Sequence, residues 1–308
     1  MSMPGESFAG PLPELTAEQI ALREELRADV YMLAGEIGPR NVAHPKGLAK
    51  AVAYLEGELE AAGFAPARQG FQAAGLECVN LEVEVPGTTR CDEIVLIGAH
   101  YDSVEKCPAA NDNASGVAGV LALARRLVHT APARTLRFVL FVNEEPPHFQ
   151  TRYMGSWVYA KRCRERDENI VAMLSLETIG YFDDSPASQH YPVPGLDRFF
   201  PSVGDFIAFV GNLKSRKLVH EAIGAFRELA AFPSQGVALP GVVTGVGWSD
   251  HWAFWQEDYP ALMVTDTAPF RYPHYHTLED TPDKLDYDRF ARVVDGMGSV
   301  IGRLTKTL

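Results

Sequence analysis

The stretch LRFVLFVNEE, residues 136–145, decides the expected fold class. It is almost entirely apolar up to Val142 and then ends in two adjacent carboxylates, Glu144 and Glu145. A short apolar run of this kind is typical of a strand that is buried on both faces of a sheet. Two neighbouring acids repel each other unless a cation holds them or one of them keeps a proton. The stretch therefore predicts a buried strand whose carboxyl end carries two acids that need a cation or a retained proton.

Other short apolar runs surround this one in the sequence. They are EIVLIGAH at 93–100, VAMLSLETIG at 171–180 and PALMVTDT at 260–267. Helical stretches at 115–129 and 155–166 separate the first three runs from one another. Apolar runs that alternate with helices indicate parallel strands buried on both faces, and so an α/β protein with a doubly wound sheet.

The remaining segments complete the expected organisation of the chain. We expect amphipathic helices near 17–36 and 46–63, a half-buried strand in ECVNLEVEVPG, a strand in DFIAFVGN, a helix at 215–232 and a final helix at 287–304. Residues 1–308 are expected to form one domain, in which 1–15 is a flexible arm rich in Pro and Gly. The less regular region 181–248 is expected to be a cap-like elaboration of the sheet or of its edge.

The acidic composition of the chain excludes some classes of binding partner. The 308 residues include 40 acids and 28 bases, which gives a formal charge of −12. This balance argues against nucleic acid or an anionic membrane as the partner, because both require basic patches. The sequence has no apolar run long enough for a membrane helix and no signal-like N-terminus, so we expect a cytoplasmic protein with its four cysteines reduced. The oligomeric state does not follow from the sequence.

Chemically reactive side chains follow the ends of the expected strands. In open α/β sheets, ligands bind at the carboxyl ends of the strands. The side chains at these ends, or in the loops that follow them, are His100, Asp112, Glu144, Glu145, Glu177, His274 and His276. Imidazole and carboxylate groups are ligands that zinc accepts. The sequence therefore predicts a metal site at this edge of the sheet.

Each of these residues has a simpler interpretation when it is taken alone. Asp112 could cap a helix, and Glu177 could be an exposed charge at a strand end. His100 could be a histidine bonded to a backbone carbonyl, and the Glu144–Glu145 pair could be a solvated turn. These separate interpretations do not predict that all of the residues gather at strand ends, so the joint pattern favours the metal site.

The same segments resemble peptidase family M28, a family of zinc peptidases. The matching stretches are GAHYDS, NDNASGVAGVL, NEE followed by GSWVYA, SLETIGY, SDHWAFWQEDYPAL and YHTLEDTPDKLD. They cover roughly residues 95–290 in the order that the family has. The resemblance implies a three-layer α/β/α sandwich around a mostly parallel mixed sheet, as in zinc exopeptidases. In this family the third strand often ends in Asp, whereas here it ends in Glu177.

The resemblance also implies a role for each site residue. His100 and Glu177 would bind one zinc ion, Glu145 and His276 would bind a second, and Asp112 would bridge the two. Glu144 would be the uncoordinated general base, and Asp102 would orient the imidazole of His100. Asp250 would support a ligand or the amine of the substrate. Tyr275, Arg271 and Tyr272 lie beside His276 in the sequence and could support an oxyanion or a substrate carboxylate, although an aromatic loop that packs against the cap explains them as well. His251 and His274 are further candidates by residue type, but neither is expected to bind a metal.

The expected activity is that of a zinc-dependent exopeptidase. An aminopeptidase that removes the first residue of a peptide with a free N-terminus is favoured, because spare carboxylates at the site would attract an α-ammonium group. Trp248, Trp252 and Trp255 could line an apolar pocket for that residue, although core packing explains them as well. The alternatives are an acyltransferase like glutaminyl cyclase, with one zinc ion, and a catalytically dead relative that only binds. The preferred first residue and the metal in use do not follow from the sequence.

Overall fold

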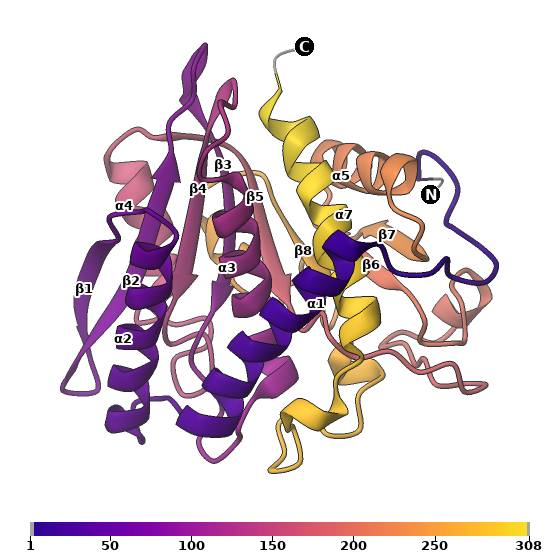
Figure 1. Cartoon of the computed structure of the whole chain (residues 1–308), viewed down its shortest axis with the longest axis horizontal. Helices are drawn as coiled ribbons and strands as arrows, with labels where there is room; N and C mark the ends of the chain where they lie inside the picture. The colour runs from indigo at the N-terminus through magenta and orange to yellow at the C-terminus, as the bar shows by residue number, and fades with distance from the viewer. Residues whose placement is uncertain (1–2, 307–308) are drawn as a thin grey trace.

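Eight strands form one sheet in the computed structural model, which describes residues 3–306. Their order across the sheet is β1-β2-β4-β3-β5-β8-β6-β7 (Figure 1). The strands are β1 (Ala67–Ala73), β2 (Leu76–Val85), β3 (Arg90–His100), β4 (Arg134–Phe141), β5 (Asn169–Glu177), β6 (Ile207–Gly211), β7 (Ser234–Ala238) and β8 (Ala261–Thr265).

The centre of the sheet is parallel and its two sides are mixed. Strands β4, β3, β5 and β8 run parallel to one another, whereas β1, β2 and β6 each join the sheet through an antiparallel pairing. The outermost strand β7 is parallel to β6. The expected α/β fold with a mostly parallel mixed sheet is therefore confirmed.

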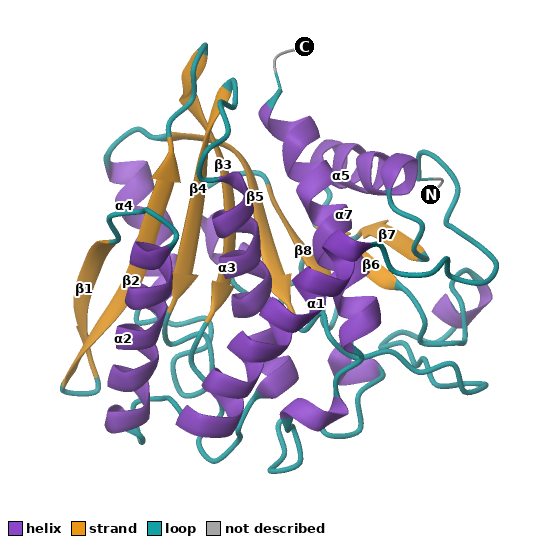
Figure 2. Ribbon diagram, in the orientation of Figure 1, coloured by secondary structure: helices purple, strands orange, loops and turns teal. Residues whose placement is uncertain are grey.

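Helices cover both faces of this sheet (Figure 2). They are α1 (Ala17–Val30), α2 (Pro45–Ala61), α3 (Gly116–Leu127), α4 (Gly155–Glu165), α5 (Arg216–Leu229), α6 (His251–Gln256) and α7 (Tyr287–Thr305). Residues of α1, α2, α3, α5 and α7 share one apolar core with the sheet, whereas Tyr159 of α4 and Phe254 of α6 belong to a second core. Because alternate residues of a strand point to opposite faces, the two cores lie on opposite sides of the sheet, which makes three layers.

Shorter helical turns lie between these elements. Tyr31–Ile37 and Ala110–Ser115 are π-helical, and Leu196–Arg198, Ala268–Phe270 and Pro282–Lys284 are 3₁₀ turns. The helix expected at 17–36 is thus an α-helix that continues as a π-helix from Tyr31. No helix among residues 3–306 combines the length and the apolar character needed to cross a membrane.

The sequence patterns missed β1 and β7. Both strands contain Gly and Gln, and β1 is largely exposed, so neither contains an apolar run or a clean alternation. Backbone hydrogen bonds to β2 and β6 stabilise these two strands, although their side chains show no strand pattern. Strand β7 lies within 181–248, together with β6 and α5, so this region contributes directly to the sheet.

The N-terminal segment lies against the β6–β7 side of the molecule. Residues 3–16 form neither helix nor strand. The amide of Ser234 donates to the hydroxyl of Ser7, and the guanidinium of Arg227 donates to the carbonyl of Gly5. The expectation that 1–15 is a flexible arm stays a prediction, and residues 1–2 lie outside the described range.

A matched pair of substitutions tests where the core lies. Phe138 of β4 is 1% exposed, whereas Phe199 is 80% exposed. Phe138→Ala should lower the free energy of unfolding by about 3–5 kcal/mol, because it leaves a cavity in the core. Phe199→Ala should change it by no more than about 0.5 kcal/mol. Urea unfolding followed by circular dichroism measures both, and equal losses would contradict the assignment of the core.

Candidate metal centre

The carboxyl ends of three neighbouring strands meet at one edge of the sheet. Strand β3 ends at His100 and strand β5 ends at Glu177. Glu144 and Glu145 follow β4, which lies beside β3 in the sheet. Asp112 lies in the π-helical turn between β3 and α3, and His276 lies in the long connection between β8 and α7. Residues far apart in sequence are thus brought together by the parallel strand order.

Two groups of ligand-type side chains share Asp112. The first group is His100, Asp112 and Glu177, and the second is Asp112, Glu145 and His276. Within each group the ligand atoms lie within 4.8 Å of one another. One oxygen of Asp112, Oδ1, lies 3.4 Å from Nε2 of His100, and the other, Oδ2, lies 2.9 Å from Nε2 of His276. The carboxylate of Asp112 therefore faces both groups at once.

In each group a glutamate lies about as close to the histidine as Asp112 does. Oε2 of Glu177 is 3.3 Å from Nε2 of His100, and Oε1 of Glu145 is 3.3 Å from Nε2 of His276. Glu144 belongs to neither group, and its nearest oxygen lies 3.8 Å from Nε2 of His100. The two adjacent acids that end the β4 segment are thus placed differently, one inside a group and one beside it.

The donor atoms suit a metal cation. His100 is fully buried, and neither of its ring nitrogens has a hydrogen-bond partner among the described residues. The buried Oε1 of Glu145 also lacks such a partner within that range. Buried polar atoms without partners are costly, and neutral imidazole and carboxylate are ligands that zinc accepts. The side chains present therefore fit zinc.

The titration of these groups reflects their crowding. Burial raises the pKa of Glu145 to about 7, and the neighbouring Asp112 adds to this effect. Burial also raises the pKa of Glu144 well above its ordinary value, aided by the charges of Glu145 and Glu177. For His276 burial acts in the opposite direction, but Asp112 and Glu145 raise its pKa to about 10. Closely packed carboxylates thus compete for positive charge, which a metal cation would supply.

The loop that carries Asp112 is fixed by the polar residues around it. Asn113 accepts the amide protons of Gly116 and Thr178 and donates to the carbonyl of Leu176, so it joins the loop to the end of β5. A Cβ at Gly116 would lie 2.2 Å from the carbonyl oxygen of Leu176, which leaves room for glycine only. Helix α3 begins at Gly116 and Asp112 has non-helical dihedral angles, so the helix-cap interpretation of Asp112 does not hold.

Asp280 supports the same loop and was not singled out from the sequence. Its carboxylate accepts the backbone amides of Asn111 and Asp112, at 2.8 and 3.1 Å, and the hydroxyl of Tyr272 at 2.9 Å. These bonds hold the backbone of the loop at Asp112 without using the Asp112 carboxylate. The signal available in the sequence was its position four residues after His276, in HTLED.

Arg40 is a second residue that sequence patterns missed. Its side chain is fully buried and donates to the carbonyl oxygens of Tyr101, Leu33, Gly38, Pro108 and Ala109. Burial lowers the pKa of this guanidinium to about 10, although Asp102, Asp112 and Asp280 oppose the effect. Arg40 thus ties the start and the end of the loop between His100 and Asp112 to the N-terminal helices. No local pattern distinguishes such an arginine from a surface one.

Asp102 holds the backbone of the two acids. Its two carboxylate oxygens accept the amides of Glu144 and Glu145, each at 3.1 Å. Its Oδ1 lies 3.6 Å from Nδ1 of His100, which is longer than a hydrogen bond. Asp102, which was expected to orient His100, therefore holds the Glu144–Glu145 turn through hydrogen bonds. Its interaction with His100 is electrostatic.

The SDH segment supports Glu177 rather than supplying a ligand. The hydroxyl of Ser249 donates to Oε2 of Glu177 at 2.6 Å. Asp250 is fully buried, makes no hydrogen bond through its carboxylate within residues 3–306, and burial raises its pKa to about 7. Nε2 of His251 lies 2.8 Å from the carbonyl oxygen of Val246, so its ring faces the protein backbone. His251 belongs to neither ligand group.

In the loop before α7, Tyr275 and Tyr272 contact different parts of the site. The ring of Tyr275 stacks on the ring of His276, with their centroids 3.8 Å apart. Tyr272 donates to Asp280, and Arg271 donates to Gln189 and to the carbonyl of Phe206. Of the three residues expected to face an oxyanion or a substrate carboxylate, only Tyr275 therefore packs against a member of the ligand groups. His274 belongs to neither group and packs edge-on against Tyr272.

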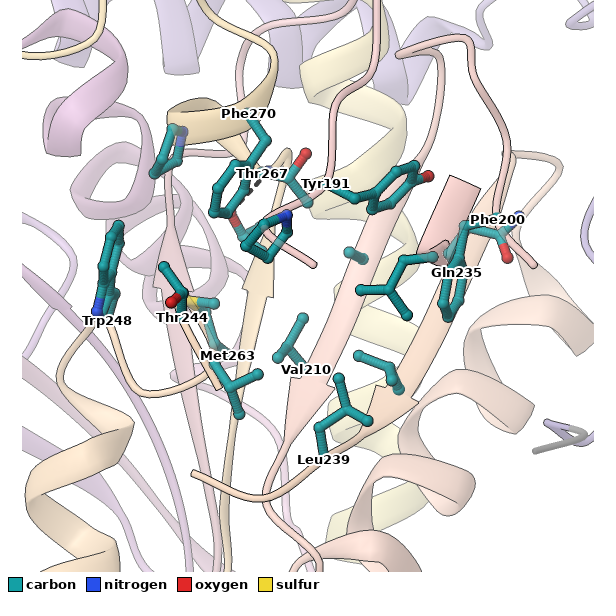
Figure 3. A pocket seen from close by; sticks show the side chains of 18 of the residues that line it. Tyr191, Phe200, Val210, Gln235, Leu239, Thr244, Trp248, Met263, Thr267 and Phe270 are labelled. Atoms are coloured by element: carbon teal, nitrogen blue, oxygen red, sulfur yellow. Dashed lines mark hydrogen bonds between the residues drawn. The ribbon is translucent and has the colours of Figure 1, made fainter. Parts of the chain in front are cut away.

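An apolar cavity with a volume of about 110 Å³ adjoins the ligand groups. Glu177, Tyr275 and Phe206 belong to its lining. Val210 and Met263 also line it, and Figure 3 shows their side chains. Trp248 belongs to the lining, whereas Trp252 and Trp255 pack into the helix layer and the sheet. Small apolar cavities of this order of size accommodate a hydrocarbon group.

Comparison with known proteins agrees with this architecture. The zinc aminopeptidase BSAP of Bacillus subtilis superposes with a TM-score of 0.73 at 14% identity, over 92% of this chain and 95% of that one. A glutaminyl cyclase of Fimbriiglobus ruber superposes with a TM-score of 0.68 at 20% identity, over 96% of this chain and 99% of the other. At these identities the likeness shows a common fold.

Sequence comparison identifies the family. The profile described as peptidase family M28 matches residues 80–301, so the chain belongs to this family. It is 35% identical over 282 residues to the uncharacterized protein YfbL of Escherichia coli, over 89% of this chain and 86% of that one. It is 26% identical over 238 residues to the probable leucine aminopeptidase 1 of Trichophyton verrucosum, over 72% of this chain and 56% of the relative. The resemblance seen in the sequence is thus confirmed.

The buried His251 provides a pH test of this part of the structure. Burial lowers the pKa of His251 to about 4, against about 6.5 in an unfolded chain. Between these values the unfolded state binds more protons, so stability should fall as the pH falls. Because of His251 alone, the free energy of unfolding should fall by about 2–3 kcal/mol between pH 7 and pH 4.5.

The control is His251→Gln, which can still donate to the carbonyl of Val246 but cannot titrate. Unfolding free energies of both proteins in chelator, at pH 7 and pH 4.5, isolate the histidine from the metal ligands. The variant should lose less stability on acidification than the parent protein does. The same loss in both would show that His251 is not buried as a neutral ring.

Proposed function

We propose that this protein is a zinc aminopeptidase that uses two metal ions. The proposal is carried by one observation, which is that two ligand groups share Asp112 while Glu144 lies beside them and belongs to neither. His100 and Glu177 would hold one ion, and Glu145 and His276 would hold the other. When bound, zinc polarises a carbonyl group and makes water a nucleophile at neutral pH.

Glu144 is the general base of the proposed reaction. It would take a proton from the attacking water and deliver it to the departing amine, so that its carboxylate is regenerated in each turnover. The raised pKa of this buried carboxyl supports the role, because such a group exchanges a proton near neutral pH more readily than an exposed glutamate. The backbone amide of Glu144 donates to the carboxylate of Asp102, so the backbone at this position is held without a metal ion.

The surplus of carboxylates supports a substrate with a free N-terminus. Glu144 and Asp250 are buried beside the ligand groups without belonging to either. An α-ammonium group brings the positive charge that such acids favour, whereas an acylated N-terminus does not. The apolar cavity next to Glu177 then receives the side chain of the first residue. Tyr275, which packs on His276 and lines the same cavity, would donate its hydroxyl to the carbonyl oxygen as negative charge develops.

A glutaminyl cyclase-like acyltransferase is the second candidate, supported by the fold shared with the Fimbriiglobus ruber enzyme. That reaction is expected to need one zinc ion, for which either ligand group alone would be enough. The second complete group, with its own histidine, favours the two-metal hydrolase. A relative that only binds is disfavoured because both ligand groups and the base are present together.

Glu144→Gln and Asp112→Ala should fail in different ways. Glu144→Gln removes the base and leaves both ligand groups intact, so turnover should fall on the order of 100-fold or more with zinc content unchanged. Asp112→Ala removes the shared ligand, so both zinc content and turnover should fall. Elemental analysis after dialysis gives the zinc content, with two ions per chain expected for the parent protein.

The two measurements separate the candidate functions. One zinc ion per chain in the parent protein would contradict the two-metal proposal and favour the cyclase. Near-parental turnover in Glu144→Gln would exclude this residue as the base. Full zinc content in Asp112→Ala would contradict the sharing of its carboxylate.

A panel of substrates tests the direction of cleavage. Chromogenic amides of leucine, phenylalanine and alanine, each with a free and an N-acetylated amine, should be hydrolysed only in the free form. Chelator should abolish the hydrolysis, and added zinc should restore it. Equal hydrolysis of the acetylated amides would show that the α-ammonium group is not recognised, and would replace the aminopeptidase with an amidase or an endopeptidase.

A further inference from the structure

The floor of the apolar cavity is the face of the sheet itself. The strand register places Glu177 of β5 opposite Thr265 of β8, Thr265 opposite Ala208 of β6, and Ala208 opposite Gln235 of β7. Directly paired residues point to the same face of a sheet. All four of these residues line the cavity, so together they form one row that runs from the metal centre to the outermost strand.

A second row lies beside the first. Met263, Val210 and Val237 are paired across β8, β6 and β7, and each is two residues away from a member of the first row. They also line the cavity, and all three are apolar. Figure 3 shows Trp248 and Gln235 on opposite sides of the cavity, with Met263 and Val210 between them. The floor is therefore a continuous apolar track over three strands.

The length of this track exceeds one amino-acid side chain. Neighbouring strands lie about 4.8 Å apart, so the row from Glu177 to Gln235 spans about 14 Å. With bonds of about 1.5 Å, the longest standard side chain reaches only about half of that distance from its Cα. A leucine or phenylalanine side chain that starts beside Glu177 would leave the far part of the cavity unfilled.

The far end differs chemically from the middle. Gln235 lies on β7 and lines the cavity, and its carboxamide makes no hydrogen bond with another residue in the range 3–306. Phe200 and Leu196 line the cavity from the loop that precedes β6. In the middle of the floor stands Ala208, whose small side chain keeps the track open. The cavity is thus charged at the metal end, apolar along its floor and polar at its far end.

We propose that this cavity takes an unbranched apolar group of about eight carbons, which extends about 10 Å along the sheet from the metal centre toward Gln235. The inference rests on the proposed function, because the group is the side chain of the residue that the enzyme removes. The substrates are accordingly amides of α-amino acids with long linear aliphatic side chains. Ala208 determines the accepted length, and Gln235 marks its limit.

Binding of a series of free amino acids tests the inference without requiring turnover. Norvaline, norleucine, 2-aminooctanoic acid and 2-aminodecanoic acid are titrated into the zinc-loaded protein in a calorimeter. The dissociation constant should fall about fourfold for each added methylene through 2-aminodecanoic acid. A minimum at norleucine, or an absence of measurable binding by the two longest acids, would overturn the inference.

Two variants locate the group within the cavity. Ala208→Val narrows the floor between the metal centre and Gln235, so it should weaken binding of the two longer acids more than tenfold and change norvaline binding less than twofold. Gln235→Leu extends the apolar floor and should strengthen 2-aminodecanoic acid alone. If Ala208→Val weakened the binding of all four amino acids equally, at an unchanged melting temperature, the proposed path along the sheet would be contradicted.

Hydrolysis of the corresponding para-nitroanilides separates this inference from the proposed function. If the aminopeptidase proposal fails, no anilide is cleaved, while the methylene dependence of binding remains. If the length inference fails, the leucine anilide is cleaved but the longer ones are not preferred over it. Binding and turnover that both improve with length support the two proposals together.

Discussion

Mutual repulsion among buried carboxylates is the constraint around which this site is built. Asp112, Glu144, Glu145 and Glu177 are all buried at the same edge of the sheet, where His100 and His276 complete the two ligand groups found among residues 3–306. Acids in such surroundings either hold protons or share a cation, and burial raises the pKa of three of the four. A fold that keeps them together must therefore hold their backbones by other means.

Those means are hydrogen bonds with residues that belong to neither ligand group. Asp280 accepts the amides before and at Asp112, and Asp102 accepts the amides of Glu144 and Glu145. Ser249 binds the Glu177 carboxylate directly. Because these contacts exist within the protein alone, the ligand groups are preorganised, and a cation has little rearrangement to drive.

The sheet separates chemistry from recognition. Strands β4, β3 and β5 are parallel and deliver the acids and His100 to their shared carboxyl edge. Beyond β5, loops cover one face of β8, β6 and β7 together with Trp255 of α6, and the apolar cavity lies there. Glu177 lines both regions, because it ends the strand at which they meet. The proposed substrate lies across this boundary, with its amide at the acids and its side chain over the cavity floor.

The sequence by itself determined the fold class and the residue types of the site. Short apolar runs such as 136–142, alternating with helices, indicate strands buried on both faces, and the ends of these strands then locate His100 and Glu177. Tertiary structure alone decided the roles of Arg40, Asp280 and Ser249, and the register that carries the cavity to Gln235. Hydrogen bonds between distant residues and lateral strand order leave no periodic trace in a sequence, because they depend on which strands become neighbours only after folding.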